Sequence, residues 1–230
     1  FDHFGFTSGR GDVVLCYSSS EVAALKHTIP QIKKAYPVQF PFSKYRRASR
    51  NKSNNLLLLL GCYWKELPEN EFQLWVETIK QIAEKISIDE VNLRFHPRTN
   101  PSLQWPKKMI ASIKQCGYRV NVNDEKKISL VDSSPDYVCI VGTVSGSLRT
   151  ARSVNTGFVI GLLNASGWID EKAWMLGEIS GIHWVKEGEA IGKEKLVSFA
   201  QVSTLPTAAE TIQNLLIEKL SRNIPQSMEH

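Results

Sequence analysis

The sequence predicts an α/β fold, in which helices cover both faces of a parallel sheet. Several short runs are apolar throughout, such as "LLLLL" at 56–60 and "YVCIV" at 137–141. Strands of this kind are typical of parallel sheets that are buried on both sides. Between them lie longer segments whose apolar residues recur every three or four positions, which indicates amphipathic helices. The alternation of the two patterns predicts a Rossmann-like domain.

The opening of the chain is expected to form a strand, a helix and a second strand. Residues 12–17, "DVVLCY", are apolar after the first position, and the serines that follow suit the start of a helix over 21–26. The stretch "VQF" at 38–40 is expected to be a second short strand, closed by Pro41. Because so short a segment cannot bury a core of its own, we expect residues 1–42 to be the tail of a preceding α/β domain or an accessory βαβ unit.

A regular alternation begins after a polar, basic linker at 43–55. We expect strands at 56–63, 90–95, 118–122, 137–141, 157–163 and 183–185. We expect helices at 69–86, 103–115, 128–133, 144–153, 173–179, 193–201 and 208–221. The helix over 69–86 has the clearest apolar face. Gly117 follows the helix expected over 103–115 and is placed to end it. The strands and helices from 56 to 202 would form the Rossmann-like domain, and 203–230 a C-terminal helix and tail.

Composition and charge narrow the classes of partner. The 230 residues carry a formal net charge of +5, which favours anionic partners such as phosphates. The basic cluster Lys44–Lys52 has no aromatic platform on which bases could stack, so we expect a solvated linker and no nucleic-acid partner. The longest apolar run, "LLLLLGCYW", is too short to span a bilayer. We therefore expect a cytoplasmic protein.

The cysteines and carboxylates offer no expected metal site. Cys16, Cys62, Cys116 and Cys139 lie too far apart for a C-x-x-C zinc motif. Buried free thiols in a reducing compartment are the simplest interpretation. The sequence also has no D-x-D motif and no carboxylate cluster. We expect neither a metal nor another cofactor.

The strand at 90–95 ends in an unusual way, in "FHPRTN". Pro97 cannot donate to the ladder, so it ends the strand, and it restricts the backbone just after His96. The imidazole would then lie at the carboxyl edge of the sheet, where open parallel sheets bind their ligands. It could donate a hydrogen bond to a phosphate, or it could only satisfy neighbouring carbonyl groups. Arg98 is a further candidate for a phosphate contact.

A second loop of interest, "GTVSGS", joins the strand at 137–141 to a helix. Its glycines allow close approach of a ligand to the backbone, and the amides of a helix start favour an anion. The alternative is an ordinary helix cap, for which serine and threonine are also typical. His96 and Ser145 both follow strands that end at the same edge, where Gly61 also lies, so the sequence predicts a phosphate site between them. The candidate residues of this loop are Gly142, Thr143, Ser145, Gly146 and Ser147.

These two motifs resemble those of a known family. A strand ending in His-Pro, followed by a strand that leads into a Ser/Thr-rich helix start, is similar to the donor domain of GT-B glycosyltransferases. Within that group the chain resembles the bacterial sialyltransferase and polysialyltransferase families, and the capsule Kdo transferases and CDP-glycerol polymerases use a similar arrangement. The resemblance spans roughly residues 10–220, but only the two motifs are specific. It departs from the families in the second motif, where Gly146 separates Ser145 from Ser147.

The resemblance implies a site for a CMP-activated sugar, of the sialic acid or Kdo type. His96 would contact the donor phosphate and could protonate the leaving nucleotide. Ser145, with Ser147 or Thr143, would bind the same phosphate. An acidic residue near the last helices would hold the ribose, and Glu171 is our candidate. No metal would be required.

The resemblance also implies partners for this chain. The acceptor would be an oligosaccharide or a glycolipid in surface glycan or capsule synthesis, with peripheral association at the inner membrane face. In the related families the catalytic base is an acidic residue of the preceding acceptor domain, in a motif that we do not find near the start of this chain. Because the sequence begins with Phe1, we expect it to be the donor half of a longer enzyme.

The sequence leaves two other functions open. One is a CDP-glycerol or other polyol-phosphate transferase, which would use the same phosphate site. The other is a non-catalytic GT-B-like domain that binds a nucleotide sugar or a glycan.

Overall fold

The chain divides into two compact units in a computed structural model. The larger unit is Phe42–Gln201, and the smaller one combines Phe1–Pro41 with Val202–His230. The structure describes residues 13–16, 19–29, 31–32, 34–39, 54–61, 65–123, 129–143, 145–155, 157–162, 182–185, 189–192 and 205–222.

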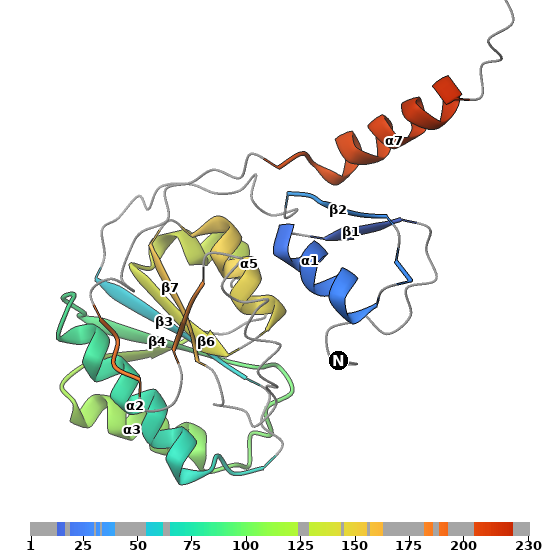
Figure 1. Ribbon diagram of the computed structural model, residues 1–230. Helices are drawn as coiled ribbons and strands as arrows, with labels where there is room; N and C mark the ends of the chain where they lie inside the picture. The colour runs from blue at the N-terminus through green and yellow to red at the C-terminus, as the bar shows by residue number, and fades with distance from the viewer. Residues whose placement is uncertain are drawn as a thin grey trace, which may run out of the picture. The chain divides into compact units, whose positions relative to one another are not determined.

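The elements of the two units are shown in Figure 1. The strands are β1 (Val14–Cys16), β2 (Ala35–Pro37), β3 (Asn55–Leu60), β4 (Glu90–Phe95), β5 (Arg119–Val122), β6 (Cys139–Thr143), β7 (Phe158–Leu162) and β8 (His183–Val185). The helices are α1 (Ser19–Thr28), α2 (Glu69–Ala83), α3 (Trp105–Gln115), α4 (Leu130–Ser133), α5 (Gly146–Val154) and α7 (Ala208–Arg222), with a 3-10 turn, η3, at Ser134–Asp136.

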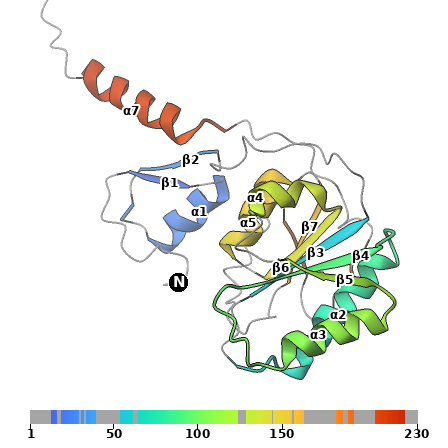
Figure 2. The same cartoon turned by 180° about the vertical axis from the view of Figure 1, so that it is seen from behind.

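The larger unit is built on a six-stranded sheet in the order β5-β4-β3-β6-β7-β8. Every neighbouring pair in it is parallel, which confirms the predicted Rossmann-like α/β fold. The chain moves outward from β3 to β5, then returns to the other side of β3 as β6 and moves outward again (Figures 1 and 2). The strand order therefore reverses between β3 and β6, and such a switch point is where ligands bind to open α/β sheets.

Helices α2 and α3 cover one face of this sheet (Figure 1). The sheet contributes alternate residues, including Leu56, Leu58 and Leu60 from β3, because successive side chains of a strand point to opposite faces. The helices contribute Phe72, Trp75, Val76, Ile79, Ile82, Trp105, Met109 and Ile113. Trp75 is fully buried, as the helical periodicity of the sequence predicts.

Helix α5 covers part of the opposite face, with α4 beside it (Figure 2). Leu57 and Leu59 of β3 belong to the same buried cluster as Leu148 and Ala151 of α5. Gly142 lies inside β6, and a Cβ atom there would lie 3.1 Å from both Leu148 Cδ1 and Leu59 Cβ. The missing side chain thus allows α5 to pack closely on the sheet.

The smaller unit contains a β1–α1–β2 segment and α7. Strands β1 and β2 are parallel, and Pro206, just before α7, accepts a hydrogen bond from the Gln39 amide at 2.8 Å. A small buried cluster lies between α1 and the strands. It consists of Cys16, Leu25, Ile32 and Ala35.

The strand expected at 38–40 is wrong, since β2 occupies Ala35–Pro37. Ala35 anchors the strand in the small core, and the pairing runs from Val14 opposite Ala35 to Cys16 opposite Pro37. The Lys34 carbonyl and the Val38 amide bond to β1, so the nitrogen of Pro37 faces away from that strand. A proline is tolerated at such a position because no donor is needed there.

Other boundaries shift by a few residues. Strand β3 ends at Leu60 instead of continuing to 63, and α4 is a single turn that leads into η3, where Pro135 lies. Gly117 has a φ of +91°, which confirms its predicted place just after α3. The helices expected at 173–179 and 193–201, and the basic cluster Lys44–Lys52, lie outside the described residues. Among the helices that the structure describes, none is long and apolar enough to cross a membrane.

Asn155 ties the end of α5 to the neighbouring turns. It is fully buried, and its Nδ2 donates to the carbonyl groups of Ser134 and of Tyr137, the latter at 2.9 Å. Its Oδ1 accepts the amide of Gly157 at 2.6 Å. One side chain therefore satisfies backbone groups that precede β6 and β7, the two strands on either side of α5 in the sequence.

Replacement of Asn155 by alanine is expected to lower the free energy of unfolding by about 2–4 kcal/mol, because it leaves buried backbone groups without a partner. Urea unfolding monitored by circular dichroism measures this change. Asn214→Ala, at an exposed position of α7, is the matched control. A loss of less than about 0.5 kcal/mol for Asn155→Ala would contradict this role.

Candidate functional site

The candidate site lies at the carboxyl edge of the sheet, where the loops after β3, β4 and β6 meet. The register pairs Leu60 with Phe95 and Leu59 with Gly142, so Phe95, Leu60 and Thr143 lie at one level on three neighbouring strands. His96 and Gly61 follow directly after this level. The three loops that sequence reasoning selected are therefore adjacent, and they flank the switch point of the sheet.

His96 is held by its own loop. Its Nδ1 accepts the amide of Arg98 at 3.1 Å, and its carbonyl oxygen accepts the amide of Thr99 at 2.8 Å. In a neutral imidazole, an Nδ1 that accepts a hydrogen bond means that Nε2 carries the proton. The ring is half-buried, and Nε2 makes no hydrogen bond within the part of the chain that the structure describes. The imidazole thus has a donor available for a ligand.

Pro97 and Arg98 form the exposed part of the turn after His96. The Arg98 amide is the group that orients the imidazole. Because Pro97 lacks an amide hydrogen, the first amide after His96 is that of Arg98, two positions on. The His-Pro pair thus ends the strand and leaves Nδ1 to accept this local bond, an arrangement similar to a side-chain turn.

Ser145 caps helix α5. It has an extended backbone, and its Oγ accepts the amide of Leu148 at 3.1 Å. The ordinary cap that the sequence left open as an alternative is therefore present. Gly146 and Ser147 lie between Ser145 and Leu148, and both are exposed. Their amides donate to no acceptor among the described residues. A helix start of this kind favours an anion.

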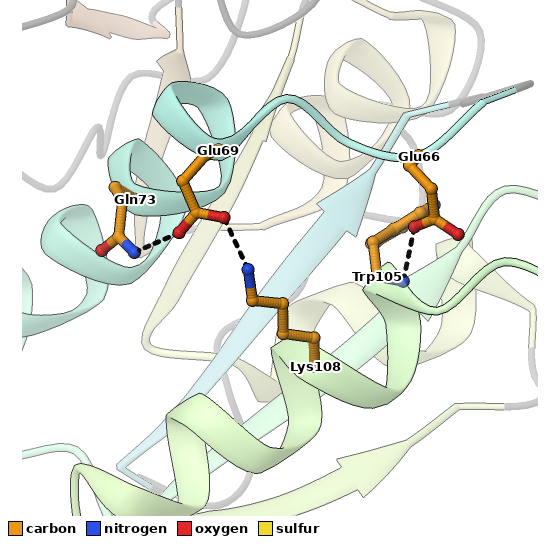
Figure 3. A network of polar contacts seen from close by, with 5 residues as sticks. All are labelled: Glu66, Glu69, Gln73, Trp105 and Lys108. Atoms are coloured by element: carbon orange, nitrogen blue, oxygen red, sulfur yellow. Dashed lines mark hydrogen bonds and ion pairs between the residues drawn. The ribbon is translucent and has the colours of Figure 1, made fainter.

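The helix starts that follow β3 and β4 differ from that of α5. Helix α2 carries Glu69 and Glu71 in its first turn, which oppose a bound anion. At α3 a carboxylate is already present, because Glu66 accepts the amides of Gln104 and Trp105 at 2.7 and 3.0 Å. Figure 3 shows the contact with Trp105. Helix α5 has no acidic residue in its first turn. Of these three helices, α5 is the one suited to an external anion.

Two predicted residues of the second loop differ from Ser145 in their surroundings. Thr143 is the last residue of β6 and is buried, and Gly142 lies beneath α5. Gly146, by contrast, is exposed, and a Cβ there would meet nothing within 4 Å. Gly142 has a packing role, whereas Gly146 and Ser147 form the open surface of the helix start.

Asn123, which follows β5, contributes to the core and not to the open edge. It is buried, and its Nδ2 donates to the Tyr137 hydroxyl at 2.7 Å. Burial raises the pKa of the Tyr137 phenol, although the bond from Asn123 and the charge of Arg94 act in the opposite direction. This pair joins the end of β5 to the segment before β6.

Glu171 lies outside the described residues. No group of three or more His, Cys, Asp or Glu side chains suited to a metal ion occurs in the described ranges. Cys16 and Cys139 are buried free thiols, as expected, and burial raises the pKa of Cys139.

Comparison with protein-family models and with curated proteins finds no match to this chain.

Glu66 is the residue of this edge that sequence reasoning missed. Its partners lie 38 and 39 residues further along the chain, so no local pattern marks it. The only sequence signal is an acidic residue shortly before α2, which reads as part of that helix start.

Ser145→Ala is expected to lower the free energy of unfolding by about 1 kcal/mol, because the Leu148 amide loses its acceptor. Ser147→Ala, at an exposed position without a capping role, is the control and should leave stability nearly unchanged. Equal effects of the two changes in urea unfolding would contradict the cap.

Stability is expected to fall at alkaline pH, in part through Tyr137. Because the pKa of its phenol is raised in the folded protein, this contribution is intact below about pH 10 and is lost as the pH rises from there through the folded pKa. In urea unfolding between about pH 8 and pH 11, Tyr137→Phe should show a shallower decline than the parent protein. Tyr36→Phe is the control, and equal slopes for Tyr137→Phe and the parent would contradict this assignment.

Proposed function

We propose that this chain is the donor-binding part of a GT-B-type glycosyltransferase that uses a CMP-activated sugar of the sialic acid or Kdo type. The donor phosphate binds between His96 and the start of α5, at residues Gly146 and Ser147. The observation that carries the proposal is the bond from the Arg98 amide to His96 Nδ1, because it leaves the Nε2 proton available beside the switch point of the sheet.

The spacing of the sheet supports a shared phosphate site. Strands β4 and β6 are separated only by β3, so their ends lie about 10 Å apart. A phosphate that makes hydrogen bonds of about 3 Å on each side fits a span of this size. The chain's net charge of +5 and the helix dipole of α5 both favour such an anion.

In the proposed reaction the acceptor hydroxyl oxygen forms a bond to the anomeric carbon of the sugar. The bond from that carbon to the phosphate oxygen of CMP breaks, and its electron pair passes to that oxygen. His96 Nε2 donates a hydrogen bond to the oxygen, and the amides of Gly146 and Ser147 stabilise the remaining charge. Ser145 holds these amides in place by capping the helix. Because the described edge contributes donors to the phosphate, deprotonation of the acceptor hydroxyl falls to a group outside these loops.

The other parts of the proposal rest on the family resemblance. The acceptor is an oligosaccharide or a glycolipid in surface glycan or capsule synthesis, and an acceptor domain that precedes this chain supplies the catalytic base. Glu171 holds the ribose of the donor. The enzyme acts in the cytoplasm, in peripheral association with the inner face of the membrane.

Isothermal titration calorimetry with CMP, CDP, UDP and GDP tests the proposal. CMP should bind most tightly, and His96→Ala should weaken CMP binding by roughly tenfold, through loss of a hydrogen bond to a charged group. Selective binding of CDP would instead favour a polyol-phosphate transferase. Absence of binding by all four nucleotides would contradict both enzymes.

Ser145→Asp distinguishes the capping role of this residue from anion binding at the start of α5. Aspartate also caps helices well, so the unfolding free energy should stay within about 0.5 kcal/mol of the parent value. Its negative charge should nevertheless weaken CMP binding by more than about tenfold, because it lies beside the bound phosphate. Ser129→Asp adds the same charge at the start of α4 and is the control. Unchanged CMP affinity in Ser145→Asp would place the phosphate elsewhere.

A further inference from the structure

We infer that Glu66 is a positioning residue for His96, which it orients through the start of α3. This inference rests on the proposed function for its effect on ligand affinity, while its structural part concerns the imidazole alone. Glu66 acts on His96 in three steps, from the carboxylate to the helix, from the helix to β4, and through the loop between them.

The first step is the contact between Glu66 and the start of α3. One carboxylate oxygen accepts the Gln104 amide at 2.7 Å. The other accepts the Trp105 amide at 3.0 Å (Figure 3). Gln104, the residue before the helix, makes no capping bond with its own side chain. A residue from the β3–α2 loop therefore acts as the cap of α3 and fixes where this helix begins.

The second step leads from Trp105 to β4. The Trp105 indole packs edge to face against Phe95, with ring centroids 5.4 Å apart. Trp105 is buried, and Phe95 directly precedes His96. The position of the first residue of α3 is thus transmitted to the residue that precedes the imidazole.

The third step concerns the loop itself, which is closed by short-range bonds at several points. After the turn from His96 to Thr99, the Asn100 side chain accepts the Ser102 amide at 3.0 Å, and the Asn100 carbonyl accepts the Leu103 amide at 3.2 Å. These bonds stiffen the two turns, His96–Thr99 and Asn100–Leu103, so that the loop passes on part of a shift at its α3 end. Displacement of Gln104 and Trp105 therefore displaces the turn that orients His96.

Glu69 provides the matched control, because it also holds α3 but does so through Lys108, away from Gln104 and Trp105. It accepts a hydrogen bond from Lys108 Nζ at 2.5 Å and another from Gln73 at 2.7 Å (Figure 3). The bond from Lys108 is the main reason why the pKa of Glu69 is lowered. Glu69→Ala removes the same charge and another contact with α3, but it leaves the amides of Gln104 and Trp105 paired.

The first test is spectroscopic and needs no ligand. Two-dimensional NMR of the five histidine rings identifies the His96 signal by its loss in His96→Ala. Glu66→Ala should shift or broaden this signal, and Glu66→Gln, which retains one oxygen acceptor, should do so less. Glu69→Ala should leave it in place. An unchanged His96 signal in folded Glu66→Ala would overturn the inference.

The second test is a double-mutant cycle with CMP as the probe. Glu66→Ala should weaken CMP binding by roughly two- to tenfold in the parent chain and have no further effect in His96→Ala, because the two changes act on one group. Equal effects in both backgrounds would overturn the positioning role. If His96→Ala does not alter CMP affinity, the proposed function fails, and the NMR test alone decides whether Glu66 orients the imidazole.

Discussion

The structure depends on the burial of β3 from both sides. Leu56 to Leu60 are each 5% exposed or less, and alternate leucines belong to the two separate clusters under α2 and α5. A strand with apolar side chains on both faces is stable only in the middle of a layered sheet. Because the chain leaves this strand toward β4 and returns beside it as β6, the loops of three strands meet at one edge.

The electrostatic potential at that edge depends on which side chains lie beside the first amides of each helix. The start of α3 is capped by Glu66, the first turn of α2 is acidic, and the start of α5 is capped by an uncharged hydroxyl. The three helices therefore present different potentials to a ligand, although their backbone dipoles are the same. Acidic side chains oppose an anion at the starts of α2 and α3 but not at that of α5, and such unfavourable alternatives are a common source of specificity between competing sites.

The features that could be predicted from the sequence are those with local causes. The apolar runs and the periodicity around Trp75 predict the sheet and α2, and "HPRT" and "GTVSGS" mark the two loops because their special residues are adjacent in the chain. The strand order, and the role of Glu66, depend on contacts between distant segments, which no local pattern contains. The short β2 was misplaced because its start is set by the packing of Ala35, a small residue with little signal of its own.

The packing at Gly142 has a consequence for the kinetics of ligand binding. Because Gly142 has no side chain, Leu148 of α5 packs so closely on the sheet that an added Cβ atom would lie only 3.1 Å from Leu148 Cδ1. A helix packed in this way keeps its first amides oriented, so a ligand of the proposed site would cost little conformational entropy there. Association at such a rigid helix start should be governed by diffusion and ionic strength, whereas slower rearrangements would have to come from other parts of the chain.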